Sequence, residues 1–152
     1  MRVGDKGTVA LVISLSSFLV AFAAASFNIA IPSIGRELKL DAVTLSWAAL
    51  AYLLSSAMFL IPMGRLADIY GRRRLFLFGN AVFTTASILL AAFPSALTLI
   101  PLRILQGFGT SMKFGTEMAI LMSVYPAEEK GKVLGLNVSA VYLGLSTGPF
   151  LG

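Results

Sequence analysis

Four side chains that could bind ions or substrate or transfer protons lie within one mainly apolar stretch, residues 96–122. They are Arg103, Gln106, Lys113 and Glu117. Spacings of three and four residues bring the members of such a series onto one helix face. The ten residues from Arg103 to Lys113 span about 15 Å of helix. Ionisable groups inside a membrane span are costly and usually functional, so we interpret this series as a path for protons or substrate.

Two structural explanations for these residues stay open. Arg103 lies near Pro101 and the start of the predicted helix, where its long side chain can snorkel to the membrane surface. Lys113 and Glu117 are four residues apart and can form a self-neutralising ion pair with only a structural role. The alternative for this pair is a proton or substrate site.

A second constellation is the basic segment of residues 64–74, which we predict to be a loop. The residues that we expect to matter for its role are Gly64, Leu66, Asp68, Gly71, Arg72 and Arg73. Gly71 permits a sharp turn between two helices. Asp68 is the one acid among these arginines and can accept charge-assisted hydrogen bonds from them or from a helix N-terminus. The segment is either an ordinary positive-inside loop or a latch that gates helix movements.

A third pattern repeats every four residues, at Gly144, Gly148 and Gly152, with Pro149 directly after Gly148. Glycines at this spacing form a flat stripe that lets another helix approach closely. Pro149 removes one backbone hydrogen bond and bends the helix.

The composition places these groups in a membrane. Hydrophobic residues make up 57% of the 152 residues and charged residues 12%, about half the usual charged share of a soluble domain. The mean hydropathy is +0.87. There is no Cys and no His, which excludes disulfides and removes the commonest general base and metal ligand. We expect no enzyme activity, cofactor or metal, and we do not attribute the net charge of +5 to nucleic-acid binding.

Long gaps between charged residues define the predicted spans. No charge occurs at residues 7–35, 42–64, 75–102 or 133–152, and about 20 apolar residues suffice to cross a bilayer. We predict an all-α membrane protein with helices near 9–33, 43–63, 75–93, 96–122 and 133–152, forming one bundle over 1–152. Cleavage of the first span as a signal peptide is the less favoured alternative, because its apolar run continues to Ile34.

The basic residues predict the orientation. Eight Lys and Arg fall in the N-terminal tail and the segments after the second and fourth spans, against two on the other side. Because cytoplasmic segments carry the excess, the N-terminus should be cytoplasmic in a multi-pass protein of the cell membrane.

Three of these patterns together resemble the major facilitator superfamily. The residues from Gly64 to Arg73 are similar to its G-x-L-x-D-R/K-x-G-R-R signature, with Ile69 where a basic residue is usual. Arg103, Gln106, Gly107 and Gly109 look like its helix 4 motif, whose Arg is linked to proton transfer. The stripe from Gly144 to Gly152 resembles the helix 5 motif of drug/proton antiporters, whose last Gly would be residue 153.

The resemblance implies a larger exporter. Residues 28–32, Asn-Ile-Ala-Ile-Pro, resemble the first helix of the 14-helix multidrug exporters, but Ala23 stands where those proteins commonly have Asp. Glu117 is then the leading acid for proton coupling. We expect an N-terminal fragment of a 12- or 14-helix transporter that, when complete, exports hydrophobic or cationic small molecules against protons. The alternatives are another metabolite or sugar transporter, or a five-helix membrane protein that pairs with a separate chain.

Overall fold

The computed structural model describes residues 3–151, and its described part consists of five helices. They are α1 (Val3–Glu37), α2 (Ala42–Tyr70), α3 (Arg72–Ala92), α4 (Ala96–Val124) and α5 (Ala127–Leu151). The all-α prediction is confirmed. Four of these helices, α1, α2, α3 and α5, are long and apolar enough to cross a membrane. The polar residues of α4 lower its mean hydropathy, so this helix is not among them.

Local signals explain where the helices begin. The Asp41 side chain caps α2 by accepting hydrogen bonds from the backbone N–H and the hydroxyl of Thr44. The Thr44 hydroxyl bond lowers the pKa of Asp41, because it favours the charged carboxylate. The Ser95 hydroxyl accepts from the backbone N–H of Thr98 at the start of α4. Acidic residues, Glu128 and Glu129, occupy the first turn of α5, where the helix dipole favours negative charge.

The segment that we predicted as a loop is mostly helical. Residues 64–70 belong to α2 and Arg72 already begins α3, so the loop prediction over residues 64–74 is wrong in its extent. Gly71 alone breaks the helix, with a φ of 99° that side-chain-bearing residues rarely adopt. Apolar residues continue the buried face of α2 to Ala67, which explains why the helix continues past residue 63.

The contacts divide the chain into two compact units. The first contains residues 3–30 and 118–151, and the second contains residues 31–117. That all five helices form one bundle stays a prediction.

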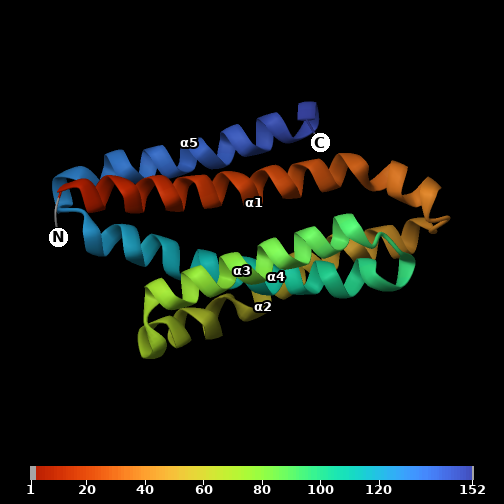
Figure 1. Cartoon of the computed structure of the whole chain (residues 1–152), viewed down its shortest axis with the longest axis horizontal. Helices are drawn as coiled ribbons and strands as arrows, with labels where there is room; N and C mark the ends of the chain where they lie inside the picture. Colours follow the sequence, from red (N-terminus) through yellow and green to blue (C-terminus); the bar gives the residue numbers. More distant parts are fainter. Residues whose placement is uncertain (1–2, 152) are drawn as a thin grey trace. The chain divides into compact units, whose positions relative to one another are not determined.

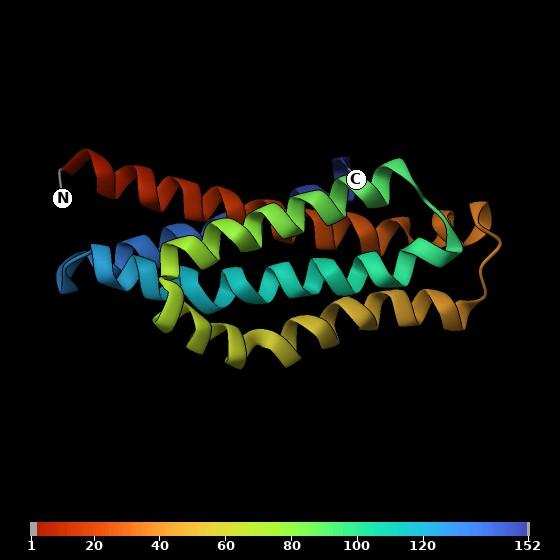
Figure 2. The same ribbon diagram turned by 60° about the horizontal axis from the view of Figure 1, so that its bottom comes forward.

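In the second unit, α4 lies between α2 and α3, as Figure 2 shows. A Cβ atom on Gly107 would collide with the backbone oxygen of Tyr52 in α2. A Cβ atom on Gly109 would lie 2.8 Å from the backbone nitrogen of Phe83 in α3. These glycines therefore allow α4 to touch the backbones of both neighbours. A buried cluster of Met63, Ala67, Leu75 and Met112 completes the core between the three helices.

In the first unit, α1 and α5 run side by side and parallel (Figure 1). The hydroxyl of Tyr125 donates to the carbonyl of Lys6 at 2.7 Å near the beginning of both helices. Further along, Gly144 lies against the backbone of Phe18, and Gly148 lies against Ala25. Because the contacts advance in the same direction on both helices, the two N-terminal ends lie together.

Candidate functional site

The polar residues of α4 are buried. Arg103 and Gln106 are each 4% exposed, Lys113 is 1% exposed and Glu117 is 5% exposed. Thr110 and Thr116, at intermediate positions, are also buried. The hydroxyls of both threonines donate to carbonyls of the same helix, four residues earlier. The side chains of α4 thus form a continuous polar stripe directed into the protein, which we call the α4 stripe (Arg103, Gln106, Thr110, Lys113, Thr116 and Glu117).

Arg103 contacts α2 directly and is linked to α3 through Gln106. Its Nε donates to the carbonyl of Ala48 in α2 at 3.3 Å, and its guanidinium lies 4.5 Å from the ring centre of Tyr52. Its Nη1 donates to the side-chain oxygen of Gln106 at 3.0 Å. Gln106 in turn donates to the hydroxyl of Ser87 in α3 at 2.9 Å. The snorkelling alternative is therefore wrong, because the guanidinium bonds within the protein interior.

Tyr52 also belongs to this site, although the sequence does not single it out. Its side chain is 8% exposed, whereas Trp47 on the same helix is 53% exposed. The Tyr52 hydroxyl lies 3.3 Å from the hydroxyl of Thr110. The only sequence signal was position: Ala48, Tyr52 and Ser55 recur at helical spacing and share one face of α2.

Lys113 and Glu117 form the other half of the stripe. The ammonium of Lys113 lies 5.0 Å from the ring centre of Phe83 in α3, a cation–π arrangement. Lys113 also interacts electrostatically with Glu117, one helical turn further on. The two alternatives for this pair, structural or functional, both agree with this geometry, so its role stays a prediction.

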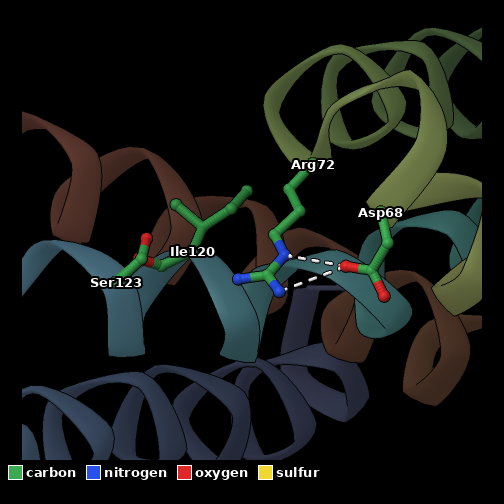
Figure 3. Close-up of polar contacts among 4 residues, drawn as sticks. All are labelled: Asp68, Arg72, Ile120 and Ser123. Atoms are coloured by element: carbon green, nitrogen blue, oxygen red, sulfur yellow. Dashed lines mark hydrogen bonds and ion pairs between the residues drawn. The ribbon is translucent and has the colours of Figure 1, made fainter.

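The motif around Gly71 has two parts with different environments. Gly64 lies against α4, where a Cβ atom on Gly115 would approach its nitrogen to 3.2 Å, and Leu66 packs on the buried cluster. By contrast, Asp68 accepts two hydrogen bonds from Arg72 across the Gly71 turn, at 3.1 and 3.3 Å (Figure 3). Both side chains of that pair are largely exposed, and Arg73 is exposed as well. The latch role of this segment stays a prediction.

The helix 5 glycines lie at the contact with α1. Gly144 and Gly148 are buried, and the hydroxyl of Ser26 in α1 donates to the carbonyl of Gly148 at 3.3 Å. Pro149 follows within α5 and is exposed. Gly152, the last glycine of the predicted stripe, lies outside the described residues.

The fold and these sites define a helical multi-pass membrane protein with charged and polar groups buried along α4. Comparison of the sequence with models of protein families identifies this membrane protein more specifically. A model of the Major Facilitator Superfamily matches residues 13–152, and the chain belongs to that family.

Curated relatives agree with this assignment. The chain is 32% identical to a riboflavin transporter of Clostridioides difficile over 97% of its own length and 32% of the relative. It is 34% identical to a multidrug resistance protein of Mycobacterium tuberculosis, covering 91% and 26% of the two chains. It is 33% identical to a cephamycin export protein of Amycolatopsis lactamdurans, covering 97% and 31%. The chain thus spans about a quarter to a third of the length of these relatives.

Proposed function

We propose that this chain is part of a transporter that exports small organic molecules across the cytoplasmic membrane in exchange for protons. The observation that carries this proposal is the buried α4 stripe, which includes two cations and one carboxylate. Buried charges of this kind mark ion and substrate pathways in membrane proteins. The names of the relatives, which include a multidrug resistance protein and an export protein, support export of small molecules.

The two halves of the α4 stripe have different roles in this proposal. Glu117 takes up and releases the coupling proton, and Lys113 responds to its charge from one turn away. Arg103 is fixed by its bond to α2 and by Gln106, which bonds to α3, and it supplies positive charge that favours ionised carboxylates or anionic groups in the path. The segment from Gly64 to Arg73 faces the cytoplasm together with the N-terminus, as the distribution of basic residues indicates.

The test uses everted membrane vesicles from cells that express the complete gene, with the lumen acidified. Addition of ethidium, a hydrophobic cation, should release protons from the lumen, and a protonophore should abolish ethidium uptake. A parallel assay with riboflavin tests the substrate that is named for the Clostridioides difficile relative. Ethidium uptake that persists in the presence of the protonophore would contradict proton coupling. Failure of both ethidium and riboflavin to release protons would contradict the proposed substrate class.

The mass of the gene product in its native membrane separates this proposal from a five-helix interaction protein. A product several-fold above 16.1 kDa agrees with a complete transporter that supplies the other helices. A product of 16.1 kDa would favour a partner chain instead.

Replacement of Asp68 by asparagine should slow transport while substrate binding stays within about twofold. The change removes the carboxylate that accepts two hydrogen bonds from Arg72 across the helix break, but it leaves the buried residues untouched. An exposed pair contributes at most about 1 kcal/mol to stability, so folding should survive. Transport rate and equilibrium binding in the same vesicles check this.

The matched control for that variant is Glu128→Gln, which removes another exposed carboxylate near a helix end. The control should transport at the normal rate. Lost substrate binding in Asp68→Asn would instead make Asp68 a folding or substrate residue.

A further inference from the structure

A cavity lies between residues 7–18 of α1 and residues 129–143 of α5, entirely within the first compact unit. Gly144 and Gly148 hold the two helices in close contact further along. Between that contact and the Tyr125–Lys6 hydrogen bond, a space of about 740 Å³ remains open. We call this space the α1–α5 crevice. Its lining extends on α1 from Gly7 to Phe18, which corresponds to about 17 Å of helix.

The walls of the α1–α5 crevice are mainly apolar. Leu15 and Phe18 line it from α1, and Leu136 and Leu143 line it from α5. Leu15, Leu136 and Leu143 are 54%, 54% and 60% exposed, so much of their apolar surface is not covered by other described residues. The volume is within the range of pockets that hold small organic molecules.

One polar group lies in this apolar wall without a partner. Ser14 is 9% exposed, and its hydroxyl oxygen makes no hydrogen bond to any described residue. The neighbouring Ser17 differs, because its hydroxyl donates to the carbonyl of Ile13 on the same helix. A buried hydroxyl without a partner costs free energy, which a bound molecule with a hydrogen-bonding group recovers.

The N-terminal end of the crevice is polar. Glu129 and Lys132, both exposed, belong to its lining there and carry opposite charges. The hydroxyl of Tyr125 is also at this end but already donates to the carbonyl of Lys6. The crevice therefore offers a polar end, a long apolar body and one unpaired hydroxyl about two helical turns inside.

We propose that the α1–α5 crevice is a binding site for an elongated, mainly apolar organic molecule that carries a hydrogen-bonding group at mid-length. The apolar body packs on Leu15, Phe18 and Leu136, and its hydrogen-bonding group pairs with Ser14. A polar end group lies next to Glu129 and Lys132. This site belongs to the first compact unit alone and does not depend on proton-driven export by the α4 stripe.

The test measures binding of N-phenyl-1-naphthylamine to the full chain in an amphipathic polymer without lipid. This probe consists of two apolar ring systems joined by one N–H group, and its fluorescence rises in apolar sites. We expect saturable binding that weakens about threefold to tenfold in Ser14→Ala, the change expected for one hydrogen bond. Leu136→Trp should weaken binding about tenfold, because the larger ring occupies part of the wall on which the apolar body of the probe packs.

Two matched variants control for general effects on α5. Leu145→Trp places the same ring on an exposed residue of that helix outside the crevice, and Ser139→Ala removes a hydroxyl that is already bonded to the carbonyl of Gly135. Both should bind the probe like the original chain. Helix content measured by circular dichroism shows that each variant is folded.

Three results would overturn the proposal. The first is a linear rise of fluorescence without saturation, and the second is equal binding in Leu136→Trp and Leu145→Trp. The third is displacement of the probe by diheptanoylphosphatidylcholine together with unchanged affinity in Ser14→Ala, which would make the crevice a site for lipid acyl chains. Loss of transport in vesicles has no bearing on any of these results, so this proposal and the proposed function fail separately.

Discussion

Replacement of Gly107 by alanine should destabilise the chain by at least about 2 kcal/mol, because it overpacks a tight helix contact. The added Cβ atom would collide with the backbone oxygen of Tyr52 and lie 2.8 Å from the Cβ of Ser55. It would also lie 3.0 Å from the backbone nitrogen of Ser56. Backbone atoms of α2 cannot rotate away as a flexible side chain can, so α2 and α4 must separate.

Two effects of this substitution oppose each other. Alanine is about 1 kcal/mol better than glycine within a helix, whereas overpacking a core costs about 1–3 kcal/mol or more. Collision with two backbone atoms of a neighbouring helix places Gly107 at the upper end of that range. Separation of the helices would also move Tyr52 away from Arg103, whose guanidinium it contacts at 4.5 Å.

Unfolding by increasing sodium dodecyl sulfate, followed by circular dichroism, measures this effect on the chain itself. Gly135→Ala is the matched control, because nothing lies within 4 Å of a Cβ atom at that position in α5. The control should be unchanged or more stable by up to about 1 kcal/mol. Equal stability of the two variants would mean that α2 and α4 do not touch closely at Gly107.

The sequence predicts the helices well because the bilayer leaves few alternatives. Long charge-free runs can satisfy their backbone only as helices, so the gaps at residues 7–35 and 75–102 locate α1 and α3 directly. The extent of α2 was harder to predict. Charged residues after residue 64 suggested a loop, but a helix tolerates them where it emerges from the apolar region, and only Gly71 ends it.

The partners of the polar residues cannot be predicted from local spacing. Helical periodicity places Gln106 on the same face as Arg103, and the two side chains are hydrogen-bonded. That Arg103 also bonds to the carbonyl of Ala48 depends on how α2 crosses α4, which is decided by the glycine contact at Gly107. The unpaired hydroxyl of Ser14 is equally invisible in the sequence, because serine within an apolar helix commonly bonds to its own backbone.

The substitution with the largest expected effect on transport is Glu117→Gln. Glutamine preserves the size of the side chain but cannot bind and release a proton, so proton-driven transport should fall by at least about 100-fold if Glu117 is the proton carrier. The same change leaves Lys113 buried beside a neutral partner. Removing one member of a buried ion pair costs about 3–5 kcal/mol, so a loss of transport in this variant alone does not distinguish coupling from folding.

A second variant separates the two roles of this pair. Glu117→Gln combined with Lys113→Met removes both charges, and replacement of a buried pair by neutral groups of similar volume is often neutral for stability. If the pair is only structural, the double variant should regain both stability and proton-driven transport. If Glu117 carries the proton, stability should return while transport stays uncoupled, because no carboxylate remains on the described part of α4.

The decisive measurement is proton release per molecule transported in vesicles, recorded beside the unfolding midpoint of each variant. Lys113→Met alone serves as the control, since it keeps the carboxylate of Glu117 and removes only its cationic neighbour. Normal proton coupling in the double variant would exclude Glu117 as the carrier and leave the structural pair as its role. Arg103 would then be the remaining ionisable group of the α4 stripe, and its fixed contacts with Ala48 and Gln106 make it suited to hold charge and not to carry protons.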